Sequence, residues 1–557
     1  MRTDYNINPD DFQPVKRQVR HIKQTKKRQP SARKSYLHHT PPPYLIPNPY
    51  NDDPFYIGGH FVPVTEMKGS IQYCGASRSG KTLQLKPSMA TAIASVRRRG
   101  ADRRVVLTDA KQDMLPMVAA LTKRIGVPFY YFNITDRRSI AYHIAEDIGG
   151  RSDKAREAAL QMIPTPRTGD AYWSQTAQAL FHAGTLTLNQ DYGTEWGLHD
   201  LYSMALMSIP QLIEFLSRNP VGRMIAQKYL PEDVGENTKF GFISQLTSSL
   251  NQIELAAAAQ YYTPKSRWLS MSKFLRSEAV LLFGTSTDTR QATNPIFQLA
   301  FRNLVSTMNL YKDSPTKKTF TFLDELPFWG KLNALQELLT FSPSKGAVTS
   351  LVFQDINHVI DIYGEKMALT ISGNCQTSLL FAPASTASAE WSVHTLGKHE
   401  FPTSRFSTNF SSSGISESES VGSEYAYPMT DGELRNLGFA NPRTGSRFVL
   451  NPMSGRPFIK SMTAQEIERW KPESGNTQLL VPRPPHEYSM PAEYCNLKRS
   501  NAFLAKTLSS QQIEEQYLST MKPGSREQQI SKQMFKVLRH VLTKQVREYN
   551  EFRQKQE

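Results

Sequence analysis

The chain has 557 residues, which is too long for a single hydrophobic core, and its hydrophobic content of 39% with a mean hydropathy of −0.47 fits a folded protein with some polar segments. The formal net charge of +16 favours a polyanionic partner, either nucleic acid or an acidic membrane surface. No run of about 18 apolar residues is present, and three widely spaced cysteines argue against a disulfide framework or a zinc site and suit a reducing cytoplasm.

Residues 1–55 are predicted to form a basic, partly disordered arm that ends in a proline-rich linker. Between residues 14 and 40 there is no acidic residue and almost no apolar periodicity. Such a segment repels itself and cannot bury enough surface to fold. The arm either binds a polyanion or is a solvated tail without a partner. Its basic residues are Lys16, Arg17, Arg20, Lys23, Lys26, Lys27, Arg28, Arg33 and Lys34.

The segment after this linker contains a phosphate-binding pattern. An apolar stretch, 71–74, leads into Gly75-Ala-Ser-Arg-Ser-Gly-Lys-Thr82, which matches G-x-x-x-x-G-K-[ST] and is followed by helix-forming residues. Backbone N–H groups and a helix N-terminus together hold a triphosphate, whereas a chance Gly/Lys loop is disfavoured by the position between a strand and a helix. Lys81 would reach the β- and γ-phosphates, and the Thr82 hydroxyl would ligate Mg²⁺. The predicted binding residues are Gly75, Ala76, Ser77, Arg78, Ser79, Gly80, Lys81 and Thr82.

Residues 56–150 are predicted to be the first part of a nucleotide-binding domain. Apolar strands are expected at 104–109 and 128–133, with a helix at 114–125 between them. Strands separated by helices indicate parallel β-α-β units, in which phosphate loops normally lie.

Residues 151–272 have a different pattern, because apolar residues recur at helical spacing and convincing strands are absent. This pattern predicts an inserted all-α domain. The second part of the nucleotide-binding domain is predicted at 273–470, with strands at 279–283, 319–323, 348–353 and 377–382. Within it, residues 404–424 are rich in Ser and Glu and are predicted to form a loop. Residues 471–557 are predicted to be a linker and a polar helical tail.

A second nucleotide-related pattern is the strand Phe320–Leu323 followed by two acidic residues, Asp324 and Glu325. Ligands bind at the carboxyl edge of parallel sheets, where Asp324 could hold Mg²⁺ through water and Glu325 could polarise the attacking water. Gln354 follows the next predicted strand and is either a sensor of the γ-phosphate or an ordinary polar strand end.

Together these segments resemble the coupling ATPases of type IV secretion and conjugation over roughly residues 70–440. The pieces that carry the resemblance are the phosphate loop, Thr108-Asp-Ala-Lys-Gln-Asp113, Phe132-Asn-Ile-Thr-Asp-Arg-Arg-Ser139, Leu323-Asp-Glu-Leu-Pro327, Val352-Phe-Gln-Asp355, Ile362-Tyr-Gly364, Ser372-Gly-Asn374 and Met429-Thr-Asp-Gly-Glu-Leu-Arg-Asn-Leu437. The resemblance implies an α/β fold of the RecA-like P-loop NTPase class, with a mostly parallel sheet and the all-α domain as an insertion. It also supports the role of Gln354 as a sensor.

The resemblance implies a function as well. A coupling ATPase binds ATP and Mg²⁺, hydrolyses ATP in a DNA-stimulated manner, and recruits DNA with its attached relaxase to the secretion channel as a homo-hexamer. Where the family has an arginine that reaches the neighbouring subunit's nucleotide, this chain has Lys345, which lacks the planar fork of arginine. The family's usual transmembrane helices have no counterpart here, so the expected location is cytoplasmic, with peripheral contact to the inner membrane through another protein or through the basic arm.

Two other functions fit the same residues. One is a P-loop ATPase of plasmid replication or partition. The other is a receptor that gathers protein cargo and uses the motor fold mainly as a scaffold, for which Lys81 and Glu325 would be dispensable.

Overall fold

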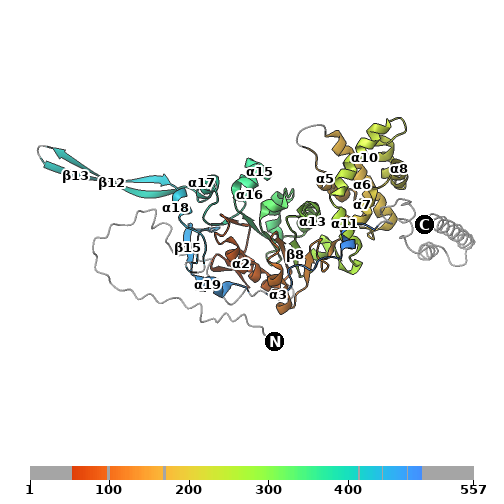
Figure 1. The fold of residues 1–557 in the computed structure, drawn as a ribbon. Helices are drawn as coiled ribbons and strands as arrows, with labels where there is room; N and C mark the ends of the chain where they lie inside the picture. The colour runs from red at the N-terminus through yellow and green to blue at the C-terminus, as the bar shows by residue number, and fades with distance from the viewer. Residues whose placement is uncertain are drawn as a thin grey trace, which may run out of the picture. The chain divides into compact units, whose positions relative to one another are not determined.

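The computed structural model describes residues 53–96, 101–166, 171–411, 414–441, 443, 445–472 and 475–491. They form two compact units. The first combines the chain up to Ile148 with Gln252–Tyr488, and the second holds Gly149–Asn251 (Figure 1). The predicted basic arm and the predicted polar tail lie outside the described residues, apart from 53–55 and the linker that precedes the tail.

The first unit is built on a nine-stranded sheet in the order β15-β14-β11-β3-β10-β9-β4-β8-β5. The strands from β11 to β5 are parallel, whereas β14 and β15 add an antiparallel edge. The strands predicted from sequence are confirmed, and the fold is the predicted α/β class. The strands are β3 (Ile71–Cys74), β4 (Arg103–Asp109), β5 (Phe129–Phe132), β8 (Val280–Gly284), β9 (Lys318–Leu323), β10 (Ala347–Phe353), β11 (Thr377–Leu380), β14 (Ser446–Asn451) and β15 (Phe458–Met462).

Helices cover both faces of this sheet, because successive side chains of a strand point to opposite faces (Figure 1). One face packs on α2 (Lys81–Val96), α3 (Leu115–Ile125) and the small hairpin of β1 (Pro54–Ile57) and β2 (His60–Pro63). On the other face Phe283 of β8 meets Phe297 of α13, whose ring lies 4.5 Å from that of Trp329. The helices that follow β8 are α13 (Arg290–Asn309), α14 (Leu335–Thr340), α15 (Ile356–Tyr363), α16 (Glu365–Gly373), α17 (Thr386–Thr395), α18 (Asp431–Arg435) and α19 (Ala464–Trp470).

The described part of the second unit is helical. Its helices are α5 (Ser152–Met162), α6 (Tyr172–Tyr192), α7 (Leu198–Met204), α8 (Ile209–Leu216), α9 (Pro220–Tyr229) and α10 (Glu236–Asn251). The extent of the all-α insertion, predicted as 151–272, differs from the extent of this compact unit. The chain from Gln252 to Tyr488 belongs to the first unit, including α11 (Glu254–Tyr261) and α12 (Met271–Leu275).

The segment predicted as a Ser-rich loop forms an antiparallel hairpin instead. Strand β12 (His399–Ser411) pairs with β13 (Gly414–Ala426) from His399 opposite Ala426 to Ser411 opposite Gly414. The Ser- and Glu-rich composition indicates only that these residues cannot bury a core. A two-stranded ladder is held by backbone hydrogen bonds, which the Ser and Glu side chains do not prevent.

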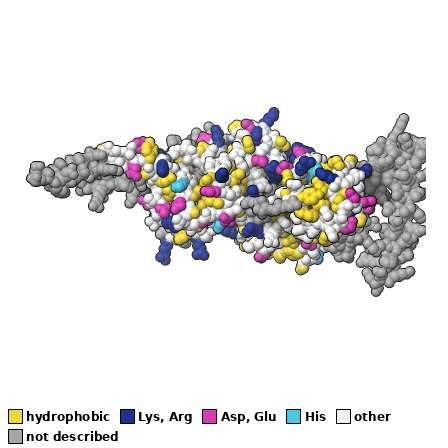
Figure 2. All heavy atoms as spheres, turned by 90° about the horizontal axis from the view of Figure 1, so that it is seen from above, with side chains coloured by type: hydrophobic (Ala, Val, Ile, Leu, Met, Phe, Trp, Pro, Cys, Tyr) yellow, Lys and Arg dark blue, Asp and Glu magenta, His cyan; other side chains and the backbone are white. Residues whose placement is uncertain are grey.

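On the surface, basic and acidic side chains are interspersed over the face of the described chain shown in Figure 2. None of the described helices is long and apolar enough to cross a membrane.

Candidate functional site

The phosphate loop, residues 75–82, connects β3 to α2, as the sequence predicts. Its glycines are required sterically. A Cβ on Gly75 would lie 2.6 Å from Cβ of Phe381, and a Cβ on Gly80, where φ is 111°, would collide with Oγ of Ser446. The Ala76 N–H donates to the carbonyl of Ala382 at 2.7 Å, which ties the loop to the end of β11. The loop is therefore packed tightly against the neighbouring strands.

Lys81 begins α2 and is buried. Its Nζ donates to the carbonyl oxygens of Gly75 at 2.5 Å and Ala76 at 2.8 Å. Burial lowers the pKa of Lys81, and the negative charge of Glu325 opposes that shift. The ammonium group thus lies inside the loop, within the electrostatic reach of the acidic pair.

Asp324 follows β9, two strands from β3, and only 2% of its surface is exposed. Burial raises its pKa to about 6. Its Oδ2 is buried and has no hydrogen-bond partner among the described residues. A buried carboxylate oxygen without a partner next to a phosphate loop fits a hydrated Mg²⁺, because Mg²⁺ prefers carboxylate and water oxygens. Thr82, at the start of α2, is the residue whose hydroxyl the loop pattern predicts as a further Mg²⁺ ligand.

Glu325 is held in place by Gln354. Nε2 of Gln354, which follows β10, donates to Oε2 of Glu325 at 2.9 Å. Glu325 adopts a left-handed backbone conformation, with φ of 51° and ψ of 58°. A positive φ is uncommon for a residue other than glycine, and such strained conformations are concentrated at functional sites. The two side chains predicted from separate strand ends are therefore in direct contact.

Lys345 is not part of this group. It ends a short 3₁₀ segment before β10, so it lies at the amino edge of the sheet, and its Nζ contacts Oδ1 of Asp313 at 2.5 Å. Gln354 lies at the opposite end of β10. Seven strand residues at about 3.3 Å each place these two ends about 23 Å apart. Lys345 therefore cannot act on the phosphate loop of its own chain.

Two residues near the site were not assigned a role from sequence. Lys111 follows β4, and its positive charge lowers the pKa of both Lys81 and Asp324. Asp109, at the end of β4, is buried and accepts hydrogen bonds from the backbone N–H groups of Asp113 and Met114. The sequence signal that could have indicated both residues is their position at the end of a parallel strand, since the carboxyl ends of all parallel strands lie at the same edge of the sheet. Helix α15, which follows β10, is also fixed to the chain after Trp329, because the Tyr363 hydroxyl at its end accepts from the Leu332 N–H at 3.0 Å.

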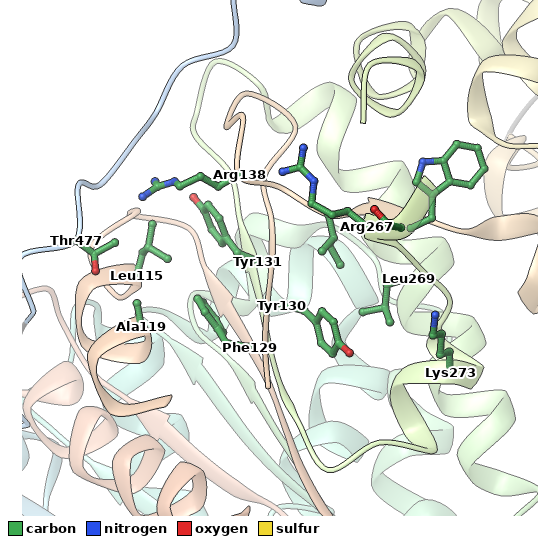
Figure 3. Close-up of a pocket in the computed structure, with 13 residues that line it drawn as sticks. Leu115, Ala119, Phe129, Tyr130, Tyr131, Arg138, Arg267, Leu269, Lys273 and Thr477 are labelled. Atoms are coloured by element: carbon green, nitrogen blue, oxygen red, sulfur yellow. The ribbon is translucent and has the colours of Figure 1, made fainter. Parts of the chain in front are cut away.

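A separate pocket of about 430 Å³ lies at the far end of the sheet (Figure 3). It is lined by Phe129 and Tyr130 of the edge strand β5, and by Arg138, Arg267 and Lys273. Four strands separate β5 from β3, which corresponds to about 24 Å at the usual strand spacing. This pocket is therefore distinct from the phosphate loop.

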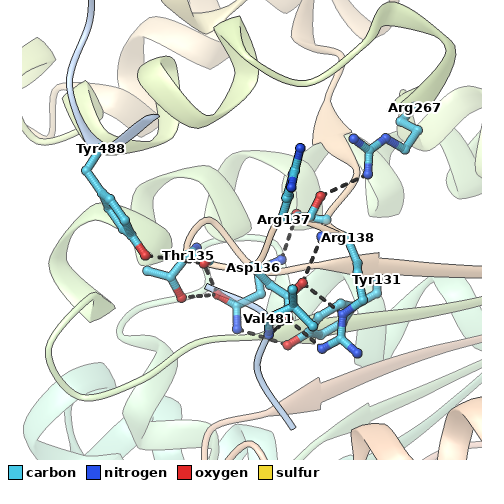
Figure 4. A network of polar contacts seen from close by, with 10 residues as sticks. Tyr131, Thr135, Asp136, Arg137, Arg138, Arg267, Val481 and Tyr488 are labelled. Atoms are coloured by element: carbon cyan, nitrogen blue, oxygen red, sulfur yellow. Dashed lines mark hydrogen bonds and ion pairs between the residues drawn. The ribbon is translucent and has the colours of Figure 1, made fainter. Parts of the chain in front are cut away.

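Next to that pocket, residues 475–488, which we call the strap, are fastened to the loop after β5 (Figure 4). Oδ2 of the fully buried Asp136 accepts from the Val481 N–H at 3.0 Å and also pairs with Arg138. The buried Arg483 donates to the Ile134 carbonyl at 2.9 Å and pairs with Glu487 at 3.0 Å. The predicted linker thus begins with an ordered segment of the first unit.

The sequence and the fold were compared with known proteins. A family model described as the type IV secretion-system coupling protein DNA-binding domain matches residues 55–437. Coupling protein TraD of Escherichia coli (strain K12) is 20% identical over 244 residues, which cover 43% of this chain and 33% of TraD. The chain therefore spans about a third of the length of this curated relative.

Solved structures of a bacterial conjugative coupling protein have the same fold. The unbound monoclinic form of TrwBdeltaN70 superposes with a TM-score of 0.61 at 16% identity, over 77% of this chain and 92% of that one. Plasmid coupling protein TrwB in complex with the ATP analogue ADPNP gives a TM-score of 0.60 at 16% identity, over 78% and 93% of the two chains. TrwB in complex with ADP and Mg²⁺ gives 0.58 at 17% identity, over 78% and 91%.

Proposed function

The chain belongs to the type IV secretion-system coupling protein DNA-binding domain family, and from that premise we propose that it is an ATPase that couples hydrolysis to the movement of DNA into a secretion channel. The observation that carries the hydrolytic part is the contact of 2.9 Å between Gln354 and Glu325 beside the phosphate loop. A protein that only binds a nucleotide does not need a carboxylate held in position beside the phosphates, whereas a hydrolase needs one to orient the attacking water.

Each residue has a distinct role in the proposed reaction. The N–H groups of the loop and the Lys81 ammonium hold the triphosphate, and Glu325 orients a water molecule and accepts its proton as that water attacks the γ-phosphorus. The bond from that phosphorus to the bridging oxygen breaks, which leaves ADP and phosphate. Thr82, and Asp324 through water, would hold Mg²⁺, which would supply positive charge against that of the phosphate oxygens. Gln354 keeps Glu325 in position.

The family resemblance extends the proposal to the assembly. We propose a homo-hexamer in which Lys345, being unable to reach its own loop, contributes its charge to the neighbouring subunit's nucleotide. DNA and its relaxase are the proposed cargo, and the basic arm is the proposed contact with DNA or with the inner membrane. TrwB binds ADPNP in one solved structure and ADP with Mg²⁺ in another, which supports ATP and Mg²⁺ here.

ATP turnover by the purified chain, with and without DNA, tests the proposal. We expect Lys81→Ala to lose nucleotide binding, whereas Glu325→Gln keeps binding and lowers turnover about 10²- to 10⁴-fold, as loss of a general base does. Lys273→Ala, at the separate pocket, is the control and keeps both. If turnover survives both site substitutions, the mechanism is wrong.

Cellular assays separate the remaining functions. A coupling protein predicts that Glu325→Gln abolishes conjugative transfer while plasmid copy number stays unchanged. A loss of copy number or of partition would indicate a replication or partition ATPase. Intact recruitment of cargo with no DNA stimulation in the wild type would indicate a receptor scaffold.

A further inference from the structure

The order of the strands gives the direction in which a nucleotide must lie. Glu325 and Gln354 follow β9 and β10, which are on one side of β3. A γ-phosphate that faces Glu325 therefore directs the rest of the nucleotide away from β10. On the other side of β3 are β11 and β14. The nucleoside should lie near the chain that leads into those strands.

The segment at that position lies between α18 and β14, where the structure describes residues 436–441, 443 and 445; we call it the α18–β14 loop, and its Ala440 rests on the phosphate loop. The Ala440 N–H donates to the carbonyl of Arg78 at 3.1 Å. A Cβ on Gly80 would lie 3.3 Å from Cβ of Ala440 and would collide with Oγ of Ser446 at the start of β14. That hydroxyl is buried and has no hydrogen-bond partner among the described residues. The phosphate loop and this segment are thus two walls of one site.

Phe439 is the large hydrophobic side chain that the described part of this segment exposes, beside the exposed polar residues Asn436, Asn441 and Arg443. It is 62% exposed, although it directly precedes the residue bonded to Arg78. The backbone after it is fixed, because Asn441 and Gly445 exchange two hydrogen bonds of 3.0 and 2.9 Å. Phe439 is therefore the chain neighbour of a residue fixed on the phosphate loop, and its ring does not belong to the core. An exposed aromatic ring gains free energy when a flat apolar surface covers it.

We propose that Phe439 is the base-stacking residue of the nucleotide site and that the α18–β14 loop forms the wall on the nucleoside side. This assignment rests on the proposed binding of a nucleoside triphosphate at the phosphate loop. Stacking uses the face of the base, which every base possesses, so it discriminates weakly between adenine and guanine. Phe439 thus contributes affinity for the nucleoside and has no part in cleavage of the γ-phosphate.

The test compares a ligand that has a base with one that lacks it. Affinities of the full chain for ATP and for inorganic tripolyphosphate are measured by calorimetry in the presence of Mg²⁺. Phe439→Ala should weaken ATP binding about 5- to 100-fold, the range that loss of one stacked base gives, and leave tripolyphosphate binding unchanged. Phe439→Trp should restore ATP affinity. Turnover at saturating ATP should stay within about threefold of wild type.

Two variants serve as controls. Phe240→Ala, on the helical unit and 69% exposed, should bind both ligands as wild type does. Lys81→Ala should lose both ligands, and if it keeps them the proposed nucleotide site itself fails. If Lys81→Ala loses both while Phe439→Ala binds ATP normally, or loses both ligands equally, the stacking role is overturned and the nucleotide site stands.

Discussion

Glu325 has a backbone conformation that its side chain disfavours. At φ of 51° an L-residue has its Cβ close to backbone atoms, which costs about 1–2 kcal/mol, whereas glycine has no such penalty. The hydrogen bond from Gln354 and the buried position of the preceding Asp324 fix this conformation from both sides. The strain is thus tied to the position of the carboxylate that the proposed hydrolysis needs.

This strain predicts an unusual order of stabilities. Glu325→Gly should be more stable than Glu325→Ala by about 1 kcal/mol, although glycine normally destabilises folded chains. Both variants should lack turnover. The measurement is the free energy of unfolding from denaturant titration, and equal stability of the two variants, or a more stable alanine variant, would contradict a strained carboxylate.

Arg483 carries the second prediction at this scale. Its guanidinium is buried, and it satisfies the Ile134 carbonyl, the Thr263 hydroxyl and the carboxylate of Glu487. Arg483→Ala should destabilise the first unit by about 3 kcal/mol, because the Ile134 carbonyl loses its donor and the partly buried carboxylate of Glu487 is left unpaired. Arg137→Ala, an exposed side chain on the loop that the strap contacts, should change the unfolding free energy by less than about 0.5 kcal/mol. Similar losses in both variants would mean that the ion pair is not what fastens the strap.

At the scale of elements, the hairpin of β1 and β2 makes the fold sensitive to acid. Burial, together with the charge of Lys460, lowers the pKa of His60 on β2 to about 4. In the unfolded chain His60 takes up a proton near pH 6.5, whereas in the folded chain the His60 side chain stays neutral down to about pH 4. The unfolded state therefore binds more protons between about pH 6.5 and 4, and stability is lost as the pH falls through that window.

The expected loss is about 1–3 kcal/mol between pH 7 and 4. Denaturant titrations at a series of pH values should show it in the wild type, and His60→Gln should show a loss smaller by that amount. Lys460→Gln should reduce the loss in part, because it removes the second cause of the shift. If all three proteins have parallel pH profiles, His60 is not the group responsible.

The sequence predicts some elements better than others. The difference depends on whether an element is stabilised by buried apolar side chains, which leave a pattern in the sequence, or by backbone pairing, which does not. Buried parallel strands such as β4 and β10 are continuous apolar runs, and motifs at their ends locate the phosphate loop and the acidic pair. Strands β14 and β15 were not predicted, because they form an antiparallel edge of mixed exposure. The hairpin of β12 and β13 was predicted as a loop, since backbone pairing leaves no apolar signal.

The candidate site shows the same division. Lys81, Asp324, Glu325 and Gln354 each follow a strand in a motif, so the sequence indicates them. The electrostatic coupling of Lys111 to Asp324, and the contact of the α18–β14 loop with Arg78, join segments that are far apart in the chain. No local pattern encodes such contacts, because they follow from the order of the strands.

At the scale of the whole molecule, the positive charge is concentrated at the two ends of the chain. Residues 1–52 contain ten Lys and Arg against four Asp and Glu, and residues 492–557 contain twelve against seven, out of a net charge of +16. Both segments lie outside the described residues. The mixed charges of the described face in Figure 2 agree with this distribution.

DNA affinity should therefore depend on salt mainly through these ends. Each phosphate contact contributes about 0.9 to the slope of log affinity against log salt concentration. Removing residues 1–52, or replacing their Lys and Arg by Gln at constant length, should lower that slope by several units in a fluorescence anisotropy titration. An unchanged slope in both variants would assign the DNA contacts to the folded units.

The sheet order also determines when during synthesis the phosphate loop can form. Ile71 of β3 pairs with Ser350 of β10 and with Thr377 of β11, which are 279 and 306 residues later in the chain. At about 5–20 residues per second, the ribosome needs about 14–60 s to make that intervening segment. Throughout this interval β3 is an apolar strand with both edges unpaired, which is the type of segment that aggregates unless a chaperone covers it. The strand that leads into the phosphate loop is thus made early and completed late, and the yield of active protein will depend on how it is protected in between.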